Sequence, residues 1–174
     1  MNKEKEQYKR VMYLADIAKM HLSSGQQVSL SELIYLGDSL TNKRQSGITT
    51  LLSFMVLDQA LYNSNNTILI VSNSLQMAKY NLQLILELLE KIKNNGFSIE
   101  YKFEKGKRII RFPNGSRVIL GNNYIESNVY DVMFVDNATF LHQKVLLSIL
   151  QSFNSGKKKL YMASNIDSVN EQTG

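Results

Sequence analysis

The sequence contains 174 residues, with 20 Lys and Arg against 15 Asp and Glu, which gives a formal net charge of +5. This length suits one domain with a single sizeable core, and a composition of 44% hydrophobic and 20% charged residues is that of an ordinary globular protein. Cysteine is absent and the two histidines are His21 and His142, which excludes disulfides, thiolate chemistry and Cys-based zinc sites and argues against a His-rich site.

The basic balance is compatible with an anionic partner such as nucleic acid, although many domains without such a partner are equally basic. The N-terminus lacks the uninterrupted apolar core of a signal peptide. No stretch approaches the roughly 18 consecutive apolar residues of a membrane span. We therefore expect a soluble protein that is not secreted and has no membrane partner.

Hydrophobic patterning predicts the elements in chain order. Apolar residues recur at helical spacing from Val11 to Leu22, which predicts an amphipathic helix ending near Ser23–Gly25. The short apolar run Leu33–Leu36 is interpreted as the first strand, and the polar stretch Asp38–Gly47 as the loop after it. The sequence TTLLSFMVLDQALY at Thr49–Tyr62 then predicts a buried helix.

The middle of the chain predicts a strand, a long helix and a hairpin. The β-branched run Thr67–Val71 is typical of a strand covered on both faces. Ser74 is a candidate N-cap for a helix that closes near Gly96. The runs Lys107–Phe112 and Ser116–Leu120 are joined by Pro-Asn-Gly, a strong signal for a hairpin turn.

The last third predicts another strand, helix and strand. Val132–Val135 is a buried-strand candidate that stops at Asp136, Leu141–Phe153 reads as a helix, and Leu160–Ala163 as a short strand. Strands and helices that alternate in this way predict an α/β fold, with a mainly parallel sheet and helices on its faces. We place the domain itself at 31–166, after an N-terminal helical segment at 1–30 and before a flexible tail at 167–174.

The loop before the helix at 49–62 has features of a phosphate-binding loop. Such a loop needs a glycine for close backbone approach, free amides at a helix N-terminus, a lysine for phosphates and a hydroxyl for magnesium. Gly47 and Thr49 stand where the second glycine and the hydroxyl belong, but Ile48 occupies the lysine position and Asn42 that of the first glycine. The alternative is an ordinary polar strand-to-helix loop.

A second candidate site element is Val132–Asn137. Four apolar residues that end in an acid describe the strand whose aspartate, here Asp136, holds magnesium in P-loop enzymes. The alternative is that Asp136 is only the residue at which a buried strand reaches water. Asn137 follows where a catalytic glutamate usually stands, and an amide can orient a water but cannot accept its proton.

Four motifs in this order resemble the ATPase domain of viral terminase large subunits. Lys43–Thr50 (KRQSGITT) looks like their deviant Walker A, in which an Arg-Gln pair commonly precedes the glycine. Arg111–Arg117 (RFPNGSR) is similar to the hairpin that the family carries before Walker B. Val132–Phe140 (VMFVDNATF) resembles its Walker B, and Met162–Asn165 sits where the family has a coupling motif.

The resemblance implies a three-layer α/β sandwich of the RecA-like P-loop class, with ATP and Mg²⁺ as cofactors. It places Asn137 at the catalytic position and Lys43 or Arg44 on the phosphates. The residues implied for nucleotide binding are Lys43, Arg44, Gln45, Ser46, Gly47, Ile48, Thr49 and Thr50; those for magnesium are Thr49 and Asp136; those for coupling are Ser164 and Asn165.

The sequence also departs from the family. Some terminases move the phosphate-binding lysine to the start of the loop, so Lys43 could replace the residue lost at Ile48. The family usually has an Arg-Gly segment where this sequence reads GNNYIES at 121–127. Terminase large subunits continue into a lid subdomain and a nuclease domain, so we expect a fragment or a stand-alone relative.

The function that the resemblance implies is a packaging ATPase that couples ATP binding and hydrolysis to translocation of double-stranded DNA. Its expected partners are DNA, a portal and a small terminase, with a possible homo-oligomer, in the cytoplasm or nucleus of the host cell. One alternative is a catalytically inactive relative that acts as a structural or regulatory binding subunit. Another is a fragment of an unrelated P-loop helicase or recombinase.

One further feature is the basic stretch Lys102–Arg117, which contains one acid, Glu104. It reads either as a DNA-backbone patch or as a solvated hairpin edge, where Lys and Arg discourage strand association. Its cations are Lys102, Lys105, Lys107, Arg108, Arg111 and Arg117.

Overall fold

The computed structural model describes residues 2–41, 47–122, 130–153 and 158–165. The helices of these ranges are α1 (Lys3–Ile17), α2 (Ser24–Leu36), α3 (Ile48–Tyr62), α4 (Leu75–Asn94), the short 3₁₀ helix η1 (Ala138–Phe140) and α5 (Gln143–Phe153). The strands are β1 (Asp38–Thr41), β2 (Thr67–Ser72), β3 (Lys102–Glu104), β4 (Ile109–Arg111), β5 (Arg117–Asn122), β6 (Val132–Asp136) and β7 (Lys159–Asn165).

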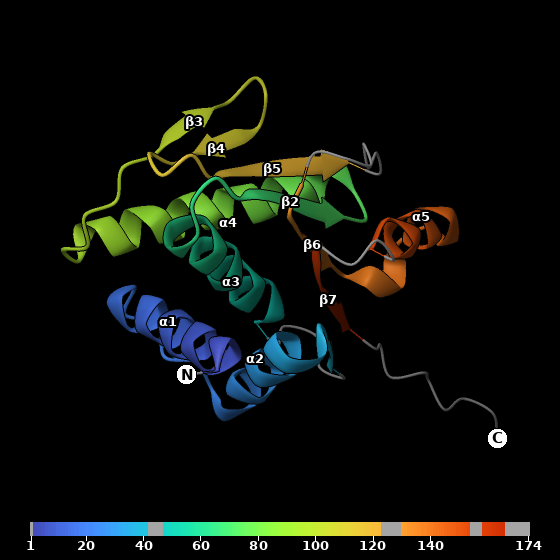
Figure 1. Ribbon diagram of the computed structural model, residues 1–174, viewed down its shortest axis with the longest axis horizontal. Helices are drawn as coiled ribbons and strands as arrows, with labels where there is room; N and C mark the ends of the chain where they lie inside the picture. The colour runs from blue at the N-terminus through green and yellow to red at the C-terminus, as the bar shows by residue number, and fades with distance from the viewer. Residues whose placement is uncertain (1, 42–46, 123–129, 154–157, 166–174) are drawn as a thin grey trace.

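The strands form one sheet in the order β1-β7-β6-β2-β5-β4-β3. Five strands, from β1 to β5 in that order, run parallel, and β3 and β4 add an antiparallel edge. Helices α1 to α4 lie on one face and α5 on the other (Figure 1). The α/β fold with a mainly parallel sheet, predicted from the alternation of elements, is confirmed.

Alternation within the central strands explains the two helical layers. Ile68 and Ile70 of β2 pack into the large core with α1 to α4, whereas Leu69 and Val71 pack on the opposite face with α5. β6 divides its residues in the same way. Because successive side chains of a strand point to opposite faces, a strand covered on both sides must be apolar throughout, as TILIV is.

The parallel register aligns the ends of four strands at one edge of the sheet. Ser72 of β2 is opposite Asp136 of β6, Asp136 is opposite Ala163 of β7, and Ala163 is opposite Ser39 of β1. Whatever follows these residues therefore emerges at the carboxyl edge of the sheet, where α/β folds bind their ligands.

Two predictions for the N-terminal part were wrong. The run Leu33–Leu36 is the last turn of α2, and the strand begins two residues later at Asp38. Helix α2 starts with a capping box between Ser23 and Gln26 and ends at Gly37, whose φ of +82° closes it. The first helix also ends early, at Ile17, shortly before the backbone turns left-handed.

The hairpin turn of β4 and β5 caps the C-terminal end of α3. The Nδ2 of Asn114 donates to the carbonyl oxygens of Ala60 at 2.8 Å and Asn63 at 3.0 Å. The hydroxyl of Ser116 donates to the Asn63 carbonyl at 2.6 Å. These carbonyls have no partner within the helix, so the Pro-Asn-Gly-Ser turn binds the end of α3 opposite the candidate phosphate loop.

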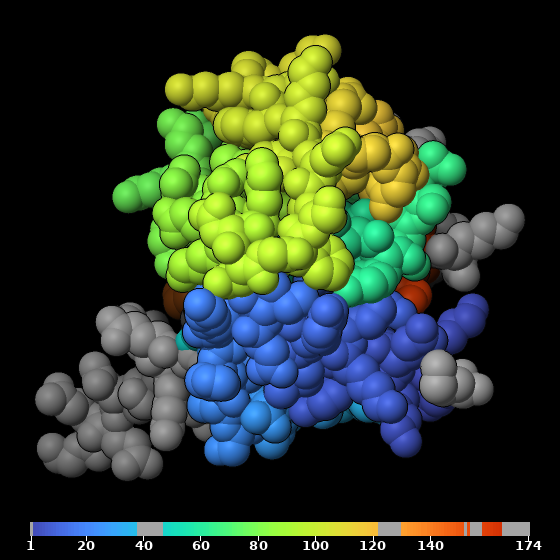
Figure 2. Space-filling model, turned by 90° about the vertical axis from the view of Figure 1, so that its left-hand side faces the viewer, coloured from blue at the N-terminus to red at the C-terminus, as the bar shows by residue number. Residues whose placement is uncertain are grey.

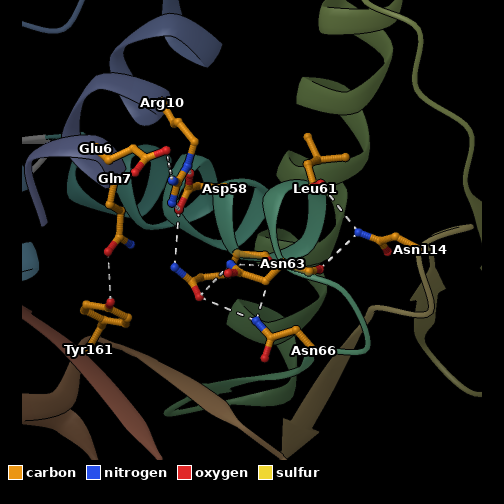
Figure 3. Close-up of polar contacts among 10 residues, drawn as sticks. Glu6, Gln7, Arg10, Asp58, Leu61, Asn63, Asn66, Asn114 and Tyr161 are labelled. Carbon is orange, nitrogen blue, oxygen red and sulfur yellow. Dashed lines mark hydrogen bonds and ion pairs between the residues drawn. The ribbon is translucent and has the colours of Figure 1, made fainter. Parts of the chain in front are cut away.

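A buried ion pair joins α1 to the middle of α3. Arg10 donates through Nε to Asp58 Oδ1 at 2.6 Å and through a second guanidinium nitrogen to Oδ2 at 3.3 Å (Figure 3). The Asp58 side chain is fully buried. Together with the apolar packing of α1 on α3, this pair holds the N-terminal helices against the rest of the molecule, where they lie beneath α4 and the hairpin (Figure 2).

Candidate nucleotide site

The predicted magnesium residues come together at the carboxyl edge of the sheet. Asp136 is the last residue of β6, and Thr49 lies in the first turn of α3. The Thr49 hydroxyl donates to the Asp136 carboxylate, with Oγ1 at 3.3 Å from Oδ1 and 3.2 Å from Oδ2. Residues 87 positions apart in the chain, each predicted as a magnesium residue, thus lie in contact, and their role in binding magnesium stays a prediction.

Two further residues complete this polar group, and the sequence had not singled them out. Asn81 of α4 donates through Nδ2 to Asp136 Oδ2 at 3.1 Å and to the Ser72 hydroxyl at 2.9 Å. Both residues are almost fully buried. A signal for each was available: Ser72 directly follows the buried strand TILIV, and Asn81 is the one polar member of the buried stripe of α4.

Among the residues that the structure describes, Asp136 has hydrogen-bond donors but no counter-charge. Its side chain is buried, and burial raises its pKa, while hydrogen bonds from Asn81, Thr49 and the backbone of Asn137 lower it. All three donors are neutral. Within the ranges that the structure describes, no cationic side chain contacts this carboxylate.

These residues fit a magnesium ion bound together with a nucleotide. Mg²⁺ prefers oxygen ligands and usually combines one or two protein groups with substrate phosphates. Thr49 and Asp136 offer a hydroxyl and a carboxylate in contact, and the buried charge of Asp136 is unbalanced by any cation among the described side chains. No group of three or more His, Asp or Glu suited to hold a metal by itself occurs in the described ranges.

The loop between β1 and α3 is described only at its end. Lys43, Arg44, Gln45 and Ser46 lie outside the described residues, so their predicted role in phosphate binding stays a prediction. Gly47 is the N-cap of α3 with φ +74°, and no side chain caps this helix in the described part of the chain. A left-handed conformation at this position favours glycine, as a phosphate loop requires.

The neighbours of Gly47 have separate roles. The carbonyl oxygen of Gly47 accepts from Nε2 of Gln26 in α2 at 3.4 Å. A Cβ at this glycine would come within 2.3 Å of the same nitrogen, so a side chain would displace Gln26. Ile48 packs its side chain in the core, which leaves only its backbone for a ligand, and Thr50 is partly exposed.

The predicted catalytic and coupling positions also lie at this edge. Asn137 adopts a left-handed conformation with φ 56° and ψ 51°, immediately after Asp136 and before η1. Ser164 is buried near the end of β7, one residue beyond the partner of Asp136. Asn165 ends the same strand. Their roles in catalysis and coupling stay predictions.

Only some cations of the basic stretch Lys102–Arg117 make contacts that stabilise the fold. Glu104 binds Arg111 at 2.8 Å and Lys107 at 3.8 Å, and Arg117 donates to the Thr67 hydroxyl at 3.0 Å. Among the described residues, no hydrogen bond or ion pair involves the side chains of Lys102, in β3, or of Lys105 and Arg108, in the turn between β3 and β4. Both interpretations of this surface, as a DNA-backbone patch or as a protected edge, stay open.

No helix in the described ranges has the length and apolar character that a membrane crossing needs.

Comparison with known proteins gives matches in structure only. No protein-family model and no curated protein matches this sequence. Among solved structures, the ATPase domain of the Thermus phage P74-26 large terminase is similar with a TM-score of 0.70 and 12% identity, over 90% of this chain and 69% of that one.

Two longer proteins match as well. The large terminase of bacteriophage HK97 has a TM-score of 0.73 at 12% identity, over 94% of this chain and 38% of that one. The large terminase of the thermophilic bacteriophage D6E, in complex with ATP-gamma-S, has a TM-score of 0.63 at 15% identity, over 83% and 38%. The chain therefore spans well under half of these two, and the fold it shares with all three is that of a terminase ATPase domain.

Proposed function

We propose that this chain is the ATPase domain of a viral DNA-packaging motor of the terminase type, and that it binds Mg²⁺ and ATP at the carboxyl edge of its sheet. The contact between the Thr49 hydroxyl and the Asp136 carboxylate is the observation that carries the proposal. It joins the helix after a glycine-containing loop to the acidic end of a buried strand. The shared fold with terminase ATPase domains supports the same assignment.

Each residue of the site has a proposed part. Gly47 allows the backbone to approach the phosphates, and the amides of the first turn of α3, which have no partner within the helix, face them. Lys43 or Arg44 supplies the cation that Ile48 lacks, and Gln45, Ser46 and Thr50 complete the loop. Bound Mg²⁺, held by Thr49 and Asp136, would neutralise charge on the β- and γ-phosphates.

Hydrolysis is the least supported part of this function. Asn137 orients the attacking water but cannot accept its proton, so its amide provides less than the glutamate usual at this position. Ser164 and Asn165, at the end of β7, couple the state of the site to movement of DNA. The proposed partners are double-stranded DNA, a portal, a small terminase and further copies of the chain, inside the host cell.

The second candidate is a catalytically inactive relative that acts as a structural or regulatory subunit. Ile48, whose side chain is in the core instead of on a phosphate, and the amide at Asn137 favour it. Such a subunit would keep the fold and the partners of the first candidate but turn over no ATP.

Binding and turnover of Mg²⁺-ATP by the purified chain separate the two. Nucleotide binding is measured first, and turnover is then compared between the wild type and Asn137→Glu. Turnover in the wild type supports a working motor in which another group replaces the base. Binding without turnover, with turnover gained in Asn137→Glu, identifies a disabled motor.

Asn137→Gln is the matched control for this substitution. Position 137 is left-handed, a conformation that costs a residue with a long side chain roughly 1 kcal/mol or more, and Asn tolerates it better than most. Gln imposes the same strain as Glu without the carboxylate. A gain in Asn137→Glu alone assigns the effect to the base, and absence of binding at millimolar ATP contradicts the proposed function.

A further inference from the structure

Asn81 differs from every other buried residue of α4. The buried face of this helix is otherwise formed by apolar side chains that pack in the main core: Ala78, Leu82, Ile85, Leu88, Leu89 and Ile92. Asn81 is 3% exposed and lies among them, yet its amide reaches the ends of two strands. It thereby joins α4, a helix that carries none of the nucleotide motifs, to the residue that ends β6.

The hydrogen bonds of Asn81 are arranged for Asp136. The Nδ2 donates to both Asp136 Oδ2 and the Ser72 hydroxyl, whereas Oδ1 is buried and has no hydrogen-bond partner among the described residues. Rotating the amide by half a turn would place its oxygen against the carboxylate, which an ionised Asp136 would repel. The unsatisfied oxygen is therefore the cost of keeping a donor on Asp136.

Packing alone does not explain an asparagine at this position. A leucine of similar size would fill the same space between α4 and the sheet without bringing an unsatisfied amide oxygen of its own. Asn81 lines a small cavity together with Thr49, Ser53 and Asp136. It is therefore part of the same group of side chains as the candidate magnesium residues. An unsatisfied polar atom that lowers stability is expected at a functional site, where a residue is selected for its role in the site instead of for packing.

We propose that Asn81 is a positioning residue for Asp136. Its amide holds Oδ2, so that the carboxylate faces the Thr49 hydroxyl and the two groups can bind one cation. The effect on metal binding rests on the proposed function, whereas the effect on the pose of Asp136 does not.

Asn81→Leu tests the proposal, with Gln83→Leu as the matched control on the exposed face of the same helix. The first readout is ADP affinity measured with Mg²⁺ and again with EDTA. We expect the strengthening of ADP binding by Mg²⁺ to fall about tenfold in Asn81→Leu, because a hydrogen bond to a charged group is lost, with EDTA affinity unchanged. Gln83→Leu should leave both affinities unchanged.

The second readout needs no nucleotide. In crystals of ligand-free Asn81→Leu, the Asp136 carboxylate should leave its contact with Thr49, while a cooperative thermal transition shows that the variant is folded. Asn81→Ala, which cannot overpack the site, should give the same change of pose. An unchanged Asp136 pose in both variants overturns the proposal, as does an unchanged effect of Mg²⁺ on ADP affinity. If the wild type binds no ADP, the proposed function fails and the crystal structures alone decide the role of Asn81.

Discussion

Asp58 and Asp136 are both buried carboxylates on one side of the sheet, but they are balanced in different ways. Burial raises the pKa of each. Asp58 receives a two-pronged contact from the Arg10 guanidinium, whereas Asp136 receives only neutral donors from the described residues. The first carboxylate has its cation within the fold, and the second is suited to a cation that arrives with a ligand.

This difference separates a residue that stabilises the fold from one that serves a site. Removing either partner of an internal ion pair destabilises the folded state, because the remaining charge stays buried without a counter-charge. A buried carboxylate with neutral donors destabilises the ligand-free protein, and a bound cation offsets this destabilisation. The predictions below test this contrast in order of expected effect.

The largest effect is expected for Arg10→Met. It leaves Asp58 buried without its cation and should lower the free energy of unfolding by about 3 kcal/mol, the lower end for a broken buried pair because Arg10 is 24% exposed. Urea unfolding measures it. Lys9→Met, on the exposed face of α1, is the control and should change little; Arg10→Met combined with Asp58→Leu should recover most of the loss. A loss below about 0.5 kcal/mol for Arg10→Met would show that the pair is no more than a surface contact.

The same variant should lose stability in a pH-dependent way. The hydrogen bond and charge of Arg10 lower the pKa of Asp58 against burial, so the pKa of folded Asp58 rises further in Arg10→Met. The folded state then holds this proton above the unfolded-state pKa of about 4, and the free energy of unfolding falls as pH rises from there toward neutrality. The deficit should be small near pH 4 and should approach the value above at pH 7. Replacing Asp58 with Asn in this background should abolish the slope; a deficit that does not vary with pH would assign the loss to packing of the Arg10 stem.

Asp136→Asn should have the opposite sign. It removes a buried charge whose donors among the described residues are all neutral, so the free energy of unfolding without ligand should stay the same or rise by up to about 1 kcal/mol. Because burial raises the pKa of Asp136, the wild type should lose stability as pH rises above about 4, and the variant should lack this part of the slope. Unfolding curves at several pH values measure both. A clear loss of stability at neutral pH would mean that Asp136 is part of the structural framework, like Asp58.

The smallest effect is expected for Thr49→Val. The contact with Asp136 is long, at 3.2–3.3 Å, and Thr49 is only partly buried, so ligand-free stability should fall by about 0.5 kcal/mol. Thr139→Val, at an exposed threonine of η1, is the control and should leave binding of Mg²⁺-ADP unchanged. Binding of Mg²⁺-ADP should weaken far more than stability in Thr49→Val. Equal weakening of this binding in the two variants would show that Thr49 has no special part in the site.

The sequence predicted the central part of the fold because period-2 and period-3.6 patterns are strong there. The strands at 67–72 and 132–136 contain the unbroken apolar runs Ile68–Val71 and Val132–Val135, and the helix between them, α4, is 20 residues long. It missed the edge. β1 at Asp38–Thr41 is polar, and its pairing with β7 comes from long-range contacts that no local pattern shows. Leu33–Leu36 was mistaken for a strand because four consecutive apolar residues can also form a helical turn, in which here Leu33 and Ile34 are buried while Tyr35 and Leu36 are exposed.

The candidate site was predicted only as far as its motifs reach. Thr49 and Asp136, each predicted as a magnesium residue, do lie in contact, because parallel strands and the helices after them meet at one edge. Asn81 was missed, because its contact with Asp136 depends on the angle at which α4 crosses the sheet. The partner of Asp58 was missed for a similar reason: Arg10 and Asp58 are 48 residues apart, and only the packing of α1 on α3 brings them together.

The most direct test of the contrast is a titration of the wild type and Asp136→Asn with ADP, in Mg²⁺ and in EDTA. If Asp136 awaits a cation that arrives with the nucleotide, Mg²⁺ should strengthen binding to the wild type by at least about tenfold, and this strengthening should disappear in Asp136→Asn while affinity in EDTA is equal or higher. Equal strengthening by Mg²⁺ in both proteins, or no nucleotide binding by the wild type, would contradict the account.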